Sequence, residues 1–210
     1  QTKLPARIAR CGSTWTPALA TSSTNAFSFA FSSVIGGAVS GSDGLVTGDI
    51  TTQTTDAIVN AANASLRGGG GVDGAIHAAA GPRLLAACRA LRRTTWPDGL
   101  PVGEAVATEG FDLPAHWVIH TVGPNAHRGQ TDPALLASCF TRSLEVAADL
   151  GATSVAFPAV SAGVYGWAAD DVARIAVEAV RGHPADGVQL VRFVLFGDRL
   201  RAAFDRALAG

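Results

Sequence analysis

Residues 60 to 74 read Asn60-Ala-Ala-Asn63-Ala-Ser-Leu-Arg-Gly68-Gly-Gly-Gly71-Val-Asp73-Gly74, and this stretch decides the fold. An apolar segment with strand character, Ala57 to Asn60, precedes it, and a helix predicted to begin near Gly74 follows it. Four glycines in a row leave the backbone amides bare, so an anion can approach them closely. The helix N-terminus points at the same place. The stretch therefore predicts a phosphate-binding loop in an α/β protein.

Polar side chains frame the glycines. Asn60 and Asn63 precede the run and Asp73 follows it, which adds neutral hydrogen-bonding groups and a candidate base beside the loop. A flexible linker would not need this frame. The run lacks the Gly-Lys-Ser/Thr ending of a Walker loop and the spacing of the dinucleotide fingerprint. The pattern predicts a polar, phosphate-bearing ligand.

Outward from this stretch, short apolar strands alternate with helical segments. The expected strands are Ala57–Asn60, Trp117–Val122, Ser154–Phe157 and Leu190–Phe196, and the expected helices after the first are Pro82–Leu91, Pro133–Leu150, Asp170–Val180 and Leu200–Leu208. Such an alternation predicts an α/β fold: a three-layer α/β/α sandwich with a mixed, largely parallel central sheet. Ligands of such sheets bind beyond the carboxyl ends of the strands.

Composition fits one globular domain with an extension. The 210 residues are 48% hydrophobic and 16% charged, with a net charge of −1. This charge and the lack of a basic cluster argue against nucleic acid as a ligand. Three widely separated cysteines predict neither a disulfide framework nor a zinc site. We expect no bound metal ion and no cofactor.

The chain divides near residue 42. Residues 1–41 are predicted to be an N-terminal extension, in which the alternating segment Phe27–Phe31 suggests an added edge strand, and residues 42–210 form the domain. No apolar run reaches transmembrane length and no compact signal-peptide block is present, so a cytoplasmic location and no membrane partner are expected. A monomer is the default expectation.

Four motifs, in order, resemble those of macrodomains of the MacroD type. They are Gly48-Asp-Ile-Thr51; Val59-Asn-Ala-Ala-Asn63 continuing through the glycines to His77; Gly103 to Pro124, with Leu113-Pro114 and Val118-Ile-His-Thr-Val-Gly-Pro124; and Pro158-Ala-Val-Ser-Ala-Gly-Val-Tyr-Gly166. The resemblance spans residues 45 to 197, and the second motif is the most specific. The first 40 or so residues lie outside it.

The resemblance implies a role for each matching residue of the first two motifs. Asp49 would accept the adenine amine and the Ile50 amide would address the ring, although Asp49 could also cap a turn. Asn63 would hold the distal ribose. Asn60 is a further ligand-binding candidate that could instead tie down its own loop. The amides of Gly69, Gly70, Gly71 and Val72 would contact the diphosphate and distal ribose, and Asp73 would activate or orient water.

The fourth motif would form a second phosphate loop. Its ligand-binding candidates are Ser161, Ala162, Gly163, Val164 and Tyr165, and Phe196 resembles the aromatic that stacks on adenine. Two positions depart from the family pattern: Ala162 stands where a small hydroxyl residue is frequent, and Ala168 stands where proline is usual. His77 and His120 are predicted to be hydrogen-bonded structural histidines, since no Gly-x-Ser-x-Gly elbow accompanies them.

The resemblance implies an ADP-ribose-binding hydrolase that removes mono-ADP-ribose esterified to Asp or Glu of proteins. Asp73 and Asn63 would be its catalytic residues, and free ADP-ribose and mono-ADP-ribosylated proteins its partners. Nucleic acid would enter only as an ADP-ribosylated substrate. Two alternatives use the same cleft. One is a reader that binds ADP-ribose without cutting it, and the other is a deacetylase of O-acetyl-ADP-ribose.

Overall fold

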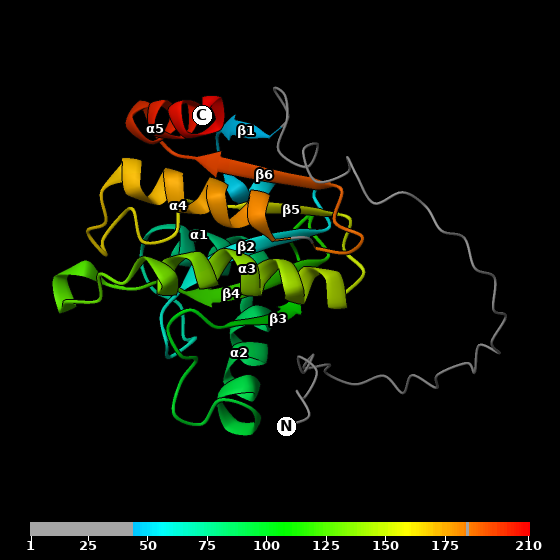
Figure 1. Cartoon of the computed structure of the whole chain (residues 1–210). Helices are drawn as coiled ribbons and strands as arrows, with labels where there is room; N and C mark the ends of the chain where they lie inside the picture. The colour runs from blue at the N-terminus through cyan, green and yellow to red at the C-terminus, as the bar shows by residue number, and fades with distance from the viewer. Residues whose placement is uncertain (1–43, 184) are drawn as a thin grey trace, which may run out of the picture.

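One mixed sheet forms the centre of the protein. The computed structural model describes residues 44–183 and 185–210 (Figure 1). The sheet order is β1 (Leu45–Thr47), β6 (Leu190–Leu195), β5 (Ser154–Phe157), β2 (Ala57–Ala62), β4 (Trp117–Val122) and β3 (Ala105–Glu109). All neighbouring pairs are parallel except β3 and β4. The predicted mixed, largely parallel sheet is confirmed.

Helices cover both faces of the sheet (Figure 1). They are α1 (Gly71–Ala80), α2 (Pro82–Thr94), α3 (Pro133–Asp149), α4 (Ala169–Gly182) and α5 (Asp198–Ala209), with short 3-10 turns η1 (Ile50–Thr52) and η2 (Ala126–Arg128). Alternate residues of β2 enter two separate cores: Val59 packs with residues of α3, α4 and α5, whereas Ile58 packs with residues of α1 and α2. The three-layer sandwich follows from strands that are apolar on both faces.

The strand predictions were right for the inner strands and incomplete at the edges. Trp117–Val122 and Ser154–Phe157 match β4 and β5 to the residue. Strands β1 and β3 were not predicted. β1 has only three residues, and β3 contains Ala105 and Ala107, which have weak strand preference and hide the alternation.

The first helix starts earlier than predicted. It begins at Gly71 rather than near Gly74, because Gly70 is extended at the N-cap and the chain turns helical immediately after it. Glycine is a poor helix former, so the run of glycines masked the start in the sequence. As a result Asp73 lies in the first helical turn.

Part of the sequence prediction lies outside the described residues. The suggested strand Phe27–Phe31 and the proposed extension, residues 1–41, belong there. Within residues 44–183 and 185–210, no helix is both long and apolar enough to cross a membrane.

Candidate functional site

A cavity of about 600 Å³ opens at the carboxyl ends of the parallel strands β2, β5 and β6. This is the edge at which ligands of parallel sheets bind. Ten of the predicted ligand residues line it: Asp49, Ile50, Gly70, Gly71, Val72, Ser161, Gly163, Val164, Tyr165 and Phe196. The fold thus brings together three motifs, the first and last of which are more than one hundred residues apart in sequence.

Five predicted residues do not line this cavity. Asn60, Asn63 and Asp73 lie behind the glycine loop, Gly69 lines a second cavity, and Ala162 packs partly buried against the core. Asn60 is fully buried and does not line the cavity, so the prediction that it contacts the ligand is wrong for this structure. Its amide contacts Asp73 of α1 and His120 of β4, so it holds neighbouring elements together and not its own loop, as the alternative had it.

Asp49 has the capping role considered from the sequence, and its position leaves it available for the predicted ligand role. It caps η1: its Oδ1 accepts hydrogen bonds from the Thr51 amide and hydroxyl, both at 2.8 Å. Its side chain is exposed at the cavity wall, and its Oδ2 has no hydrogen-bond partner among the described residues. One carboxylate oxygen therefore orients the residue while the other remains available to a ligand amine.

The glycine loop presents bare amides to the cavity. Gly70 and Gly71 line it at the N-terminus of α1, where no side chain caps the helix. The first amides of a helix have no partner within the helix and carry its positive dipole end, so they form an anion site. A Cβ on Gly69 would lie 3.1 Å from Asp73 Oδ2 and 3.3 Å from Asn63 Nδ2, so a larger residue there would push against these polar side chains.

Asp73 is a buried carboxylate that side chains hold in place. It is 4% exposed, and its Oδ1 accepts a 2.8 Å hydrogen bond from Asn60 Nδ2. Asn63 Nδ2 lies 3.4 Å from Oδ2 and also donates to the Gly68 carbonyl at 2.9 Å. His77 Nε2 lies 3.5 Å from Oδ1 without forming a hydrogen bond. Asp73 and Asn63 are thus adjacent, as their shared predicted role requires.

Burial raises the pKa of the Asp73 carboxyl above its ordinary value, and the hydrogen bond from Asn60 and the charge of His77 act in the opposite direction. A carboxylate with a raised pKa is a stronger base once ionised. Its environment therefore suits proton transfer better than a solvated surface carboxylate would.

A chain of buried hydrogen bonds extends from Asp73 into the sheet. The two N–H groups of Asn60 serve Asp73 Oδ1 and His120 Nδ1, the latter at 3.1 Å. Because Nδ1 accepts, the proton of a neutral His120 is on Nε2, which lies 3.0 Å from Thr108 Oγ1. Burial, and then the nearby His77, lower the pKa of His120 to about 3. The prediction of a structural, hydrogen-bonded His120 fits this geometry.

The second loop is strained where it meets the cavity. Ser161 adopts a left-handed φ of 68°, which is uncommon outside glycine, and its buried Oγ has no hydrogen-bond partner. A buried hydroxyl without a partner is unusual in a folded protein. Since Ser161 lines the cavity, its Oγ is available to a polar ligand.

Ten further residues line the cavity but were not predicted to be site residues, although they lie in the motifs or in predicted strands and helices. These are Gly48, Ala61, Ala62, Ala75, Gly123, Pro158, Ala159, Val160, Val194 and Leu200. Gly123 is the informative one, because a Cβ there would lie 2.2 Å from Ser161 Oγ and 2.7 Å from Val160 Cγ1. The signal was the Gly-Pro pair directly after β4, at the same sheet edge as the glycine loop.

Two large apolar side chains lie exposed at the cavity. Val164 is 86% exposed and Phe196 is 89% exposed. Phe196 follows β6 instead of ending it, so it does not belong to the core. Exposed apolar groups at a cavity rim are suited to packing against a ligand.

No metal centre accompanies the cavity within the described part of the chain: no group of three or more His, Cys, Asp or Glu there could hold a metal ion. Cys88 and Cys139 are free and buried. Burial and the charge of Asp73 raise the pKa of Cys88 to about 12, which keeps it a neutral thiol.

Comparisons with known proteins agree with this architecture. The family model described as Macro domain matches residues 59–176. A macro domain-containing protein of Streptomyces griseus is 56% identical over 79% of this chain and 93% of its own length. One from Chlorobaculum tepidum is 51% identical over 77% of this chain and 92% of its own.

Solved structures give the same result. The Oceanobacillus iheyensis macrodomain with ADP has a TM-score of 0.74 and 43% identity, covering 80% of this chain and 92% of its own. The Trypanosoma brucei macrodomain in complex with ADP-ribose has a TM-score of 0.71 and 36% identity, covering 78% and 68%. With its sheet order, its glycine loop at the head of α1 and these matches, the chain belongs to the macro domain family.

Proposed function

We propose that this protein is a hydrolase of the MacroD type, which binds ADP-ribose in the cavity and releases mono-ADP-ribose esterified to Asp or Glu of proteins. The observation that carries the proposal is Asp73: a buried carboxylate beside Asn63, separated from the phosphate-binding amides only by Gly69. Binding alone would need the loops but would not need a buried carboxylate with a raised pKa.

The cavity supports the binding half of the proposal. Its volume of about 600 Å³ is in the usual range for small-molecule sites. In the proposed pose, adenine lies between Asp49 and Phe196, and the diphosphate lies between the amides at Gly70 and the loop of Ser161. The distal ribose then lies at Val72, next to Asp73. Relatives crystallised with ADP and ADP-ribose support this choice of ligand.

The catalytic half follows from the carboxylate. Hydrolysis breaks the ester between the distal ribose and the side-chain carboxyl, and the elements of water are divided between the two products. Asp73 takes the proton of the attacking water, and its orientation is fixed by Asn60. No covalent intermediate with the protein is required. A positioned base contributes about 10²- to 10⁴-fold in rate.

The test is release of ADP-ribose from a protein mono-ADP-ribosylated on Asp or Glu, with O-acetyl-ADP-ribose as a small ester. Asp73→Asn keeps the acceptor for Asn60 but removes the base. We expect turnover of both esters to fall at least 100-fold. Affinity for free ADP-ribose, measured by calorimetry, should change less than threefold.

The control variant is Asp112→Asn, which alters an exposed carboxylate that pairs with Arg83 away from the cavity. It should keep full turnover. Unchanged turnover in Asp73→Asn would refute the role of Asp73, and tight binding by the wild-type protein without release would make it a reader.

A further inference from the structure

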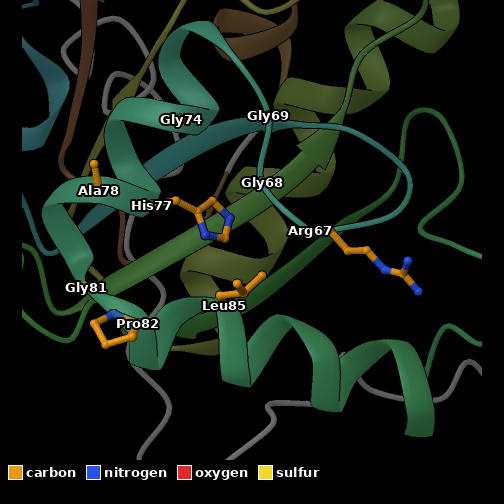
Figure 2. A pocket seen from close by; sticks show the side chains of 9 residues that line it. All are labelled: Arg67, Gly68, Gly69, Gly74, His77, Ala78, Gly81, Pro82 and Leu85. Atoms are coloured by element: carbon orange, nitrogen blue, oxygen red, sulfur yellow. The ribbon is translucent and has the colours of Figure 1, made fainter.

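A second cavity lies on the other side of the glycine loop from the first. Its volume is about 430 Å³, and it is lined by the loop residues Arg67, Gly68 and Gly69 and by Gly74, His77, Ala78, Gly81, Pro82 and Leu85 of α1, α2 and the turn between them. Figure 2 shows the His77 ring between Gly68 and Leu85, and the Arg67 side chain extending from the loop. None of the roles assigned above uses this cavity.

The two cavities are neighbours across backbone alone. Gly70 lines the first and Gly69 lines the second, and both residues are exposed. The second cavity also adjoins the proposed reacting centre, because His77 on its wall lies 3.5 Å from Asp73 Oδ1. A chain attached to the distal end of a ligand in the first cavity can therefore reach the second cavity across the exposed glycines Gly69 and Gly70.

The lining gives this cavity a definite chemistry. Arg67 is exposed and has no ion pair or hydrogen bond among the described residues, so its guanidinium is available. Asp112 lies near Gly81, but its carboxylate pairs with Arg83. The buried Asp73 is the other acidic group nearby. Ala78, Pro82 and Leu85 supply the apolar part of the lining, and the Arg67 guanidinium lies at the other end of the cavity (Figure 2).

We propose that this second cavity docks the acidic peptide segment that flanks the ADP-ribosylated residue of the substrate protein. Arg67 binds a flanking carboxylate, and the apolar lining of Ala78, Pro82 and Leu85 packs against the peptide. A single arginine at one end of an apolar lining suits a peptide better than a nucleic acid, whose phosphates would need several cations. The inference rests on the proposed function, since it assigns the protein side of that substrate.

The experiment compares two synthetic peptides, each mono-ADP-ribosylated on one Glu. One has Asp and Glu as flanking residues and the other has Gly and Ala. The wild-type protein should have the higher kcat/KM on the acidic peptide. Arg67→Glu should lower that value about fivefold, the size of an exposed charge pair, and leave the neutral peptide within twofold.

Matched variants separate charge from shape. Arg93→Glu reverses another exposed arginine, on α2 and outside the cavity, and should behave as wild type. Ala78→Trp fills the cavity from an exposed helical position and should raise KM for both peptides. Ala79→Trp, one residue further along α1, is also exposed but outside the cavity and should not. All four variants should bind free ADP-ribose as tightly as wild type.

The outcomes separate the two proposals. If wild type cleaves both peptides and the Arg67 and Ala78 variants match their controls, peptide docking is refuted while the hydrolase stands. If wild type cleaves neither peptide, the hydrolase is refuted. Fluorescence anisotropy then measures the affinity of wild type and of the same variants for the two peptides. Equal affinities would then refute docking as well. If the Arg67 and Ala78 substitutions change activity only on an ADP-ribosylated oligonucleotide, the cavity docks nucleic acid and the proposal is overturned.

Discussion

Acid should destabilise this protein through His120, whose pKa of about 3 lies well below the 6.5 of the unfolded chain. His120 is fully buried, and its Nδ1 accepts a hydrogen bond from Asn60. Protonation would place an N–H on His120 Nδ1 facing the N–H of Asn60, so the native state keeps the ring neutral. Between the two pKa values the unfolded chain binds one more proton, so stability falls as pH falls.

The magnitude follows from these values. One pH unit corresponds to about 1.4 kcal/mol, so His120 alone should remove about 2 kcal/mol of unfolding free energy between pH 7.5 and pH 5. His120→Asn cannot be protonated, and its amide oxygen can replace Nδ1 as acceptor for Asn60. It should be less stable than wild type at pH 7.5, because the contact with Thr108 is lost, but its stability should change less with pH.

Urea unfolding at pH 7.5, 6 and 5 measures the effect as the difference between the two pH profiles. Asp73 and the surface groups titrate in both proteins and largely cancel in that difference. His116→Asn changes an exposed histidine and is the control, expected to follow wild type. Parallel profiles for wild type and His120→Asn, within about 0.5 kcal/mol, would refute the assignment of a buried neutral His120.

Two further predictions concern the cavity wall. Gly123→Ala should destabilise the fold by about 1–3 kcal/mol in urea unfolding, because its Cβ would overlap Ser161 Oγ and Val160 Cγ1, whereas Gly182→Ala, in a helix with open space, should not. Equal stability of both variants would contradict the close approach. Phe196→Ala should leave stability within about 0.5 kcal/mol because the ring is exposed, yet weaken ADP-ribose binding in calorimetry about tenfold if the ring stacks on adenine. Unchanged affinity would remove Phe196 from the site.

The sequence allowed prediction of the inner sheet and of the loops at its carboxyl edge. Buried parallel strands are continuous apolar runs, and the glycine loop marks where one of them ends, so both signals are local. The edge strands β1 and β3 gave no such signal, because a strand paired on one side can be short or rich in alanine. The position of β1 also depends on a partner far along the chain, since Leu45 pairs with Phe193, whereas Ala105 of β3 pairs with Thr121 of the next strand.

The candidate base shows the same division between local and distant information. Asp73 could be identified from the glycines before it, but its burial could not, since its hydrogen-bond partner Asn60 is oriented by His120 on another strand. Burial raises the pKa of Asp73, so the ionised form is disfavoured in the fold and its contribution to stability is lost as pH rises through that pKa. A buried carboxylate with a raised pKa beside a cavity lined with bare amides is the reason that we propose catalysis and not recognition alone.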